Sequence, residues 1–118
     1  MNNFQEILKK LNINPNVYLH ICREIAESKG YNAYQLHFSD KKNKKLMYIH
    51  EGNKIHFGDS RYNDFIIYNF MFEQNLITEE YADKRREMYL ARARKIFGIW
   101  RNNNLSPNNL AIKILWAG

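Results

Sequence analysis

Six basic side chains in the C-terminal third of the chain have the type and spacing to contact the phosphates of a nucleic acid. They lie within residues 84–101, where seven basic residues and one acid give a net charge of +6, equal to that of the whole 118-residue chain. Five of the seven are arginines, whose planar guanidinium group suits phosphate contacts. The predicted phosphate-binding residues of this segment are Arg85, Arg86, Arg92, Arg94, Lys95 and Arg101.

A second group of cations lies in the polar segment SDKKNKK, residues 39–45. Its four lysines are predicted to form a mobile secondary contact: Lys41, Lys42, Lys44 and Lys45. The sequence pI near 9.5 fits an anionic partner, although an AT-rich genome would also enrich lysine and asparagine. Helical spacing spreads the arginines around their segment, so pairing with acids of the fold or with an acidic protein surface stays open.

Histidine and cysteine residues offer a weaker basis for a metal site. His37, His50 and His56 fall on predicted strands, where some of them could share one face of a sheet. The single cysteine, Cys22, lies far away on a predicted helix, whereas a zinc site needs three or four ligands. We therefore expect no metal and no cofactor.

Residues 56–64 hold two further patterns with a possible chemical role. Gly58 could let backbone amides converge on an anion, but the spacing of a P-loop is absent and a structural turn is favoured. Asp59 and Asp64 could act as paired carboxylates, although Arg61 between them makes an ion pair a sufficient explanation. Because no nucleophile motif or dinucleotide fingerprint occurs, we expect binding rather than catalysis.

Two short helices are predicted within residues 1–30 to support this chemistry. Asn3 with Glu6 is typical of a capping box, Asn14-Pro15 supplies a cap and a first-turn proline, and Gly30 is placed to end the second helix. The buried side of the second helix is predicted to hold Tyr18, Ile21, Cys22 and Ile25.

A change to an apolar period of two predicts a small antiparallel sheet within residues 34–68. Strands are expected at 34–38, 46–50 and 54–57, with a hairpin turn at 51–53. Residues 64–68 are assigned weakly to a fourth strand, because the apolar run up to Phe72 would also suit a buried helix.

Two helices are expected after the sheet. Thr78 is the predicted cap of one long helix that runs to Arg101. Its inward stripe is predicted as Ala82, Tyr89, Ala93, Ile96 and Trp100. Ser106-Pro107 predicts the start of a last helix, whose apolar side carries Leu110, Ala111, Ile114 and Leu115.

Three motifs, taken in order, resemble those of a family of small, basic, functionally uncharacterised proteins of large DNA viruses that infect algae and amoebae. The motifs are KIHFGD at 54–59 with Tyr62 and Asp64-Phe65; Arg85-Arg86, Tyr89, Arg92 and Lys95-Ile96; and SPNNLA at 106–111 with Ile114-Leu115-Trp116. The resemblance covers roughly residues 29–117 and departs from the family pattern in residues 69–81 and in the N-terminal helices. It implies a viral origin and a virion or viral-factory setting.

The sequence as a whole predicts a single α+β domain, residues 1–118. We expect two N-terminal helices, an antiparallel sheet of three or four strands, and a long basic helix and a short C-terminal helix packed on one face. The expected function is phosphate-directed nucleic-acid binding without catalysis, and the alternative is a protein–protein interaction module of a virion. The expected location is a virion or the host-cell cytoplasm, with no secretion signal and no membrane-spanning segment.

We predict that folding requires no metal ion. Thermal melts recorded with and without a strong chelator should then coincide, because the histidines make no joint contribution through a bound ion. A fall of several degrees on chelation would contradict this prediction and identify a histidine-based site.

Overall fold

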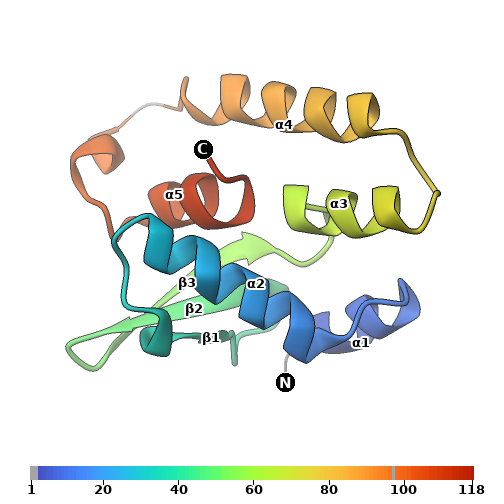
Figure 1. The fold of residues 1–118 in the computed structure, drawn as a ribbon. Coiled ribbons are helices and arrows are strands. Elements are labelled where there is room, and N and C mark those ends of the chain that lie inside the picture. Colours follow the sequence, from blue (N-terminus) through green and yellow to red (C-terminus); the bar gives the residue numbers. More distant parts are fainter. Residues whose placement is uncertain (1–2, 97) are drawn as a thin grey trace.

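Two helices precede a three-stranded sheet and the remaining helices follow it in the computed structural model, which describes residues 3–96 and 98–118 (Figure 1). The elements before and within the sheet are α1 Phe4–Lys10, α2 Pro15–Ser28, the 3-10 turn η1 Ala33–Gln35, β1 Leu36–Phe38, β2 Lys44–His50 and β3 Asn53–Asp59. Those after it are α3 Phe65–Glu73, α4 Glu79–Ala93, the 3-10 turn η2 Trp100–Asn102, α5 Pro107–Leu110 and its π-helical continuation η3 Ala111–Leu115. The predicted α+β fold class is confirmed.

Local capping signals place most of the helix ends. The Asn14 side chain accepts hydrogen bonds from the backbone N–H groups of residues 16 and 17, and Pro15 follows as the first helical residue. Gly30, with φ of 92°, lies just after the end of α2. The predicted buried side of α2 is confirmed, since Tyr18 and Cys22 have no exposed surface. The prediction of a capping box at Asn3 is wrong, because the Asn3 side chain makes no capping hydrogen bond.

The sheet is antiparallel in the order β1-β2-β3, and its register fixes which side chains share a face. Phe38, Leu46 and Phe57 lie opposite one another, and Leu36, Tyr48 and Ile55 form the next row of the same face. Leu36, Leu46, Tyr48 and Phe57 are buried there. Residues 51 and 52 make the β2–β3 turn with φ values of 50° and 80°, which is typical of a two-residue hairpin.

The predicted strand 34–38 is too long. The Asn32 side chain accepts a hydrogen bond from the Tyr34 N–H and stabilises the turn η1, so Tyr34 is 86% exposed rather than half-buried. The polar connection after β1 is shorter than predicted, because Lys44 and Lys45 belong to β2. The prediction that these two lysines lie in a mobile loop is therefore wrong.

The segment weakly predicted as a fourth strand, residues 64–68, is the start of helix α3. The carboxylate of Asp64 accepts a hydrogen bond from the Ile67 N–H and caps the helix. The apolar run reflects burial of Ile66, Ile67 and Tyr68 between neighbouring helices rather than a strand. Tertiary packing therefore overrides the β-branched and aromatic composition here.

The long helix predicted for residues 78–101 ends at Ala93. Thr78 caps it as predicted, and Ala82, Leu90 and Ala93 form its buried side. The chain leaves the helix before Gly98, whose φ is 122°, and Ile96 is half-exposed. Glycine disfavours a helix interior by about 1 kcal/mol relative to alanine, which favours an early end. Phe97 lies outside the described residues.

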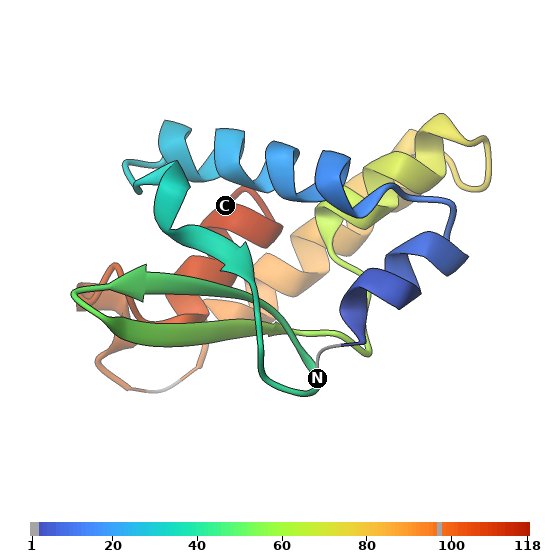
Figure 2. The ribbon, with the colours of Figure 1, turned by 90° about the horizontal axis from the view of Figure 1, so that it is seen from below.

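The C-terminal helix forms as predicted and holds α4 away from the sheet. Ser106 caps α5, and the predicted apolar residues Leu110, Ala111, Ile114 and Leu115 are all buried. In Figure 1 the sheet lies on one side, α2, α3 and α5 lie next to it, and α4 is outermost. The view from below in Figure 2 places the strands in front and α4 farthest away. None of the helices within residues 3–96 and 98–118 is long and apolar enough to cross a membrane.

The packing of β3 against the C-terminal helix is close at Gly58, which leads to a prediction about its substitution. A Cβ atom there would lie 2.7 Å from Leu115 Cδ1 and 3.2 Å from Lys45 Cβ, and φ is +82°. Gly58→Ala should therefore cost about 1–2 kcal/mol for the left-handed backbone plus about 1–3 kcal/mol for overpacking. Urea unfolding followed by circular dichroism measures the change.

Gly52→Ala is the matched control, because Gly52 has a similar φ of +80° but nothing within 4 Å of the added methyl group. It should show the backbone cost without the packing cost. Equal destabilisation of the two variants would show that the contact with Leu115 does not constrain the fold.

Candidate anion-binding cleft

A cleft with a volume of about 690 Å³ lies between α4, the paired ends of β2 and β3, the loop before α3 and the C-terminal helix. We call it the α4 cleft. It is lined from α4 by Arg85, Tyr89 and Arg92, and from the strands by Lys44 and Asp59. It exists because the C-terminal helix separates α4 from the sheet. Segments 20 to 70 residues apart in the chain therefore face one another across it.

Four cationic side chains line the α4 cleft: Lys45, which is paired with Asp64, and the three others, Lys44, Arg85 and Arg92. Arg92 follows Arg85 by seven positions, about two helical turns, so both point to the same side of α4. Lys44 approaches from the first residue of β2. The Nε atom of Arg85 is buried and has no hydrogen-bond partner among the described residues. An orphaned buried donor of this kind costs about 1–3 kcal/mol, and an anion in the cleft would satisfy it.

The one carboxylate among the described lining residues is already engaged. The Arg61 side chain donates three charge-assisted hydrogen bonds to the Asp59 carboxylate, from Nη2 to Oδ2 at 2.7 Å and from Nε to Oδ1 at 3.0 Å and to Oδ2 at 3.2 Å. These bonds lower the pKa of the Asp59 carboxyl to about 2, against a smaller opposing effect of desolvation. The predicted ion pair at Arg61 is confirmed for Asp59. Its effect is to neutralise the negative charge beside Lys44.

Aromatic rings and carboxamides complete the wall of the α4 cleft. Tyr89 and Trp116 stack with their centroids 4.1 Å apart and an interplanar angle of 7°, and burial raises the pKa of Tyr89. Tyr62 lies on the lining with 67% of its surface exposed. Asn63 and Asn108 add an amide from the loop before α3 and another from α5. The cleft thus combines positive charge, flat apolar rings and paired donors and acceptors.

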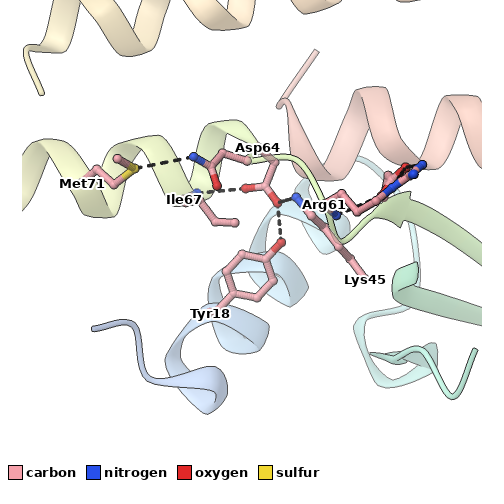
Figure 3. Close-up of polar contacts among 8 residues, drawn as sticks. Tyr18, Lys45, Arg61, Asp64, Ile67 and Met71 are labelled. Carbon is pink, nitrogen blue, oxygen red and sulfur yellow. Dashed lines mark hydrogen bonds and ion pairs between the residues drawn. The ribbon is translucent and has the colours of Figure 1, made fainter. Parts of the chain in front are cut away.

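A buried polar cluster lies next to the cleft and fixes Lys45, which also lines it (Figure 3). The Asp64 carboxylate accepts hydrogen bonds from Lys45 Nζ at 2.7 Å and from the Tyr18 hydroxyl at 2.6 Å. Lys45 and Asp64 are 2% and 1% exposed. Burial, and then the charge of Asp64, raise the pKa of Tyr18, so its hydroxyl remains a donor. Lys45 therefore stabilises the fold and is not the surface phosphate contact predicted from sequence.

The other predicted cations are scattered. Arg86 donates from Nε to the Trp116 carbonyl at 2.8 Å and from Nη2 to the Ala117 carbonyl at 2.7 Å, so it holds the C-terminal segment. Arg94 follows Arg85 by nine positions, about two and a half turns, and lies on the opposite side of α4. Lys95 and Arg101 are exposed beyond the helix, and the Arg101 guanidinium lies 4.8 Å from the ring centroid of Trp100. Lys41 and Lys42 are exposed in the β1–β2 connection.

The structure also brings together Ser39, His56 and Asp40, a combination the sequence analysis missed. Ser39 Oγ lies 2.6 Å from His56 Nδ1, and His56 Nε2 lies 3.8 Å from Asp40 Oδ1. These are the residue types of a serine hydrolase, but Ser39 is 2% exposed and its Oγ accepts the Lys41 N–H. Asp40 is shared with Lys54. The arrangement closes the β1–β2 connection and offers no accessible nucleophile.

The histidines do not assemble into a metal site within the described ranges. The register places His37 and His56 on one face, either side of Met47, and His50 on the other face at the end of the hairpin. No group of three or more His, Cys, Asp or Glu side chains in residues 3–96 and 98–118 is placed to hold an ion. Cys22 is buried, and burial raises the pKa of its thiol.

Comparison of the chain with protein-family models, curated proteins and solved structures finds no match. The viral family resemblance drawn from the sequence motifs therefore stays an expectation. The arguments about function rest on the α4 cleft itself.

The buried cluster predicts a large stability effect at Lys45. Lys45→Met should destabilise the fold by about 3–5 kcal/mol, because Asp64 would keep its charge in a buried site without a cation. Lys42→Met, which removes an exposed lysine three residues away, should change the unfolding free energy by less than about 0.5 kcal/mol.

Adding Asp64→Asn to Lys45→Met should recover part of the loss, since it removes the uncompensated charge and leaves a side chain able to cap α3. Denaturant unfolding of the three variants measures these differences. Equal effects of Lys45→Met and Lys42→Met would contradict a structural role for the Lys45–Asp64 pair.

Proposed function

We propose that this protein binds nucleic acid through phosphate contacts made at the α4 cleft, without catalysing a reaction. The observation that carries this proposal is that Lys44, Arg85 and Arg92 line one cleft, and that the one carboxylate among its described lining residues, Asp59, is bound by Arg61. Positively charged side chains that line one cleft attract an anion, and arginine contacts phosphate through short hydrogen bonds that are often paired.

Arg85 supports the proposal more than the net charge does. A solvated surface arginine satisfies its donors with water, whereas Arg85 Nε is buried and lacks a partner in the described structure. A phosphate that accepts two parallel hydrogen bonds from this guanidinium would supply that partner. Arg85 thus carries one buried donor for which residues 3–96 and 98–118 provide no acceptor.

Phosphate contacts alone carry little sequence information, so binding should be similar on unrelated sequences. Lys41, Lys42, Lys95 and Arg101 remain exposed and extend the positive surface beyond the cleft as secondary contacts. The resemblance to proteins of large DNA viruses would place this activity at a viral genome or transcript, in the virion or the viral factory.

Protein–protein contact is the second candidate function, favoured by exposed apolar side chains at the corner between α3 and α4. Phe72 is 39% exposed and Leu76 is 64% exposed, and both line a shallow cavity beside Glu79 and Glu80. Large exposed apolar side chains of this kind are common at interface centres. This corner is distinct from the α4 cleft, so the two functions can be tested separately.

The salt dependence of binding tests the nucleic-acid function. With about three phosphates neutralised on duplex DNA, log K should fall against log salt with a slope of about −3. The double variant Arg85→Gln and Arg92→Gln should reduce that slope by about two units and weaken binding alike on two unrelated duplexes. Fluorescence anisotropy over a salt series measures both quantities.

The double variant Lys84→Gln and Arg94→Gln is the matched control. It removes the same charge from α4 at exposed positions that do not line the cleft, and it should change the slope little. Arg92→Gln alone, at an exposed position, guards against misfolding of the first variant. If the two double variants changed the slope and the affinity equally, binding would depend on the net charge of the protein and not on the cleft. Undetectable binding at about 50 mM salt would eliminate this function and favour the protein–protein candidate.

A further inference from the structure

We infer that the α4 cleft receives an unpaired nucleotide, so that the protein binds single-stranded nucleic acid in preference to duplex. This inference rests on the proposed function and adds to it the form of the ligand. It follows from three kinds of side chain on one lining: the cations, the aromatic rings and the carboxamides.

Each kind of side chain matches a different part of a nucleotide. Arg85 and Arg92 provide guanidinium groups for phosphate, as argued above. Tyr62 provides an exposed ring on the same lining, and every base can stack on such a ring whatever its sequence. Asn63 and Asn108 provide amide groups, which can donate and accept at the edge of a base.

A site that bound only phosphate would need the cationic side chains but neither the aromatic rings nor the amides. The lining of the α4 cleft also holds aromatic rings and amides, which are the kinds of side chain that contact a base. The Asn63 amide donates only a weak contact, 3.9 Å to the Met71 sulfur, and the Asn108 amide makes one long contact of 3.5 Å to the Ala93 carbonyl. Neither amide is therefore tied into a strong network that would keep it from a ligand.

The size of the cleft favours a strand over a duplex. Its volume of about 690 Å³ falls within the range of about 300–1,000 Å³ typical of pockets for small molecules. In a duplex the bases are paired and stacked inside, so only phosphates and groove edges are presented. An unpaired nucleotide can turn its base toward the rings, as bases of single-stranded RNA and DNA do on aromatic platforms.

The separation of the cations favours a strand over a free nucleotide. Arg85 and Arg92 are about 10 Å apart along the axis of α4, calculated from seven positions at 1.5 Å each. Lys44 adds a third cation from the opposite wall. Cations spread over this span can each contact a different phosphate of a strand, whereas a mononucleotide offers one phosphate for them to share.

Equilibrium binding to four probes tests the inference at one salt concentration. The probes are a mixed-sequence DNA strand of about ten nucleotides, its duplex, a strand of equal length with abasic sites throughout, and adenosine monophosphate. The wild type should bind the base-bearing strand about tenfold more tightly than the abasic strand, which carries the same phosphates. It should bind the duplex and the mononucleotide more weakly than the base-bearing strand.

Two tyrosine variants separate base stacking from charge. Tyr62→Ala should abolish the preference for the base-bearing strand and leave affinity for the abasic strand unchanged. Tyr34→Ala removes a ring that is 86% exposed but lies outside the α4 cleft, and it should leave every affinity unchanged. Arg85→Lys keeps the positive charge and removes the Nε donor, and it should weaken binding to all strands.

The outcomes distinguish this inference from the proposed function. Equal affinity for base-bearing and abasic strands, or a preference that survives Tyr62→Ala, would overturn the single-strand inference while phosphate binding stands. If adenosine monophosphate bound as tightly as the base-bearing strand, the inference that the ligand is a strand would be wrong, and the cleft would be a site for a free nucleotide. Failure to bind any of the four probes would overturn the inference together with the proposed function.

Discussion

The Asp64 carboxylate accepts hydrogen bonds from three separate parts of the chain, and the fold is built around that convergence. Tyr18 donates from α2, Lys45 from β2, and the Ile67 N–H from the first turn of α3. A buried carboxylate is costly unless its oxygens are satisfied, and each partner supplies a contact that the others cannot replace. The cluster therefore specifies how the helical N-terminal half, the sheet and α3 meet. Because a buried ion pair contributes less to net stability than its geometry suggests, its main effect is to penalise alternative arrangements of these three elements.

The α4 cleft depends on this arrangement indirectly, through the position of the C-terminal helix. The Lys45 side chain lies beside Gly58, where the absence of a Cβ atom lets the C-terminal helix approach β3 closely. That helix carries Trp116, whose ring stacks on Tyr89 and whose carbonyl binds Arg86, so α4 is held over the sheet at a fixed distance. Arg85 and Arg92 line the cleft for the same reason. The cations of the cleft are thus positioned by side chains that would not bind a ligand themselves, which is how a preorganised site is expected to be supported.

Several features set by neighbouring residues could be predicted from the sequence, although the Asn3 cap and the turn at Tyr34 were predicted wrongly. Features set by distant residues could not be predicted. The caps at Asn14, Thr78 and Ser106 and the hairpin turn after β2 follow from short-range chemistry, and they were correct. Whether residues 64–68 form a strand or a helix depended on the packing of α3 between α2 and α4, and hydrophobic periodicity cannot reveal such packing. The role of Lys45 depended on a partner 19 positions away, so it was indistinguishable from its exposed neighbours. For the site, the basic character of α4 was foreseeable, but the choice of Arg85 and Arg92 over Arg86 and Arg94 required the position of the C-terminal helix.

The contact between Arg86 and the Trp116 and Ala117 carbonyls has a consequence for when the α4 cleft can exist. Its walls are drawn from positions 44 to 116, so a nascent chain on the ribosome lacks one wall until nearly all of these residues have left the exit tunnel. The N-terminal helices and the hairpin can pair earlier, because their contacts span shorter separations. The α4 cleft is therefore complete only after residue 116 has left the exit tunnel and the C-terminal helix has packed against β3.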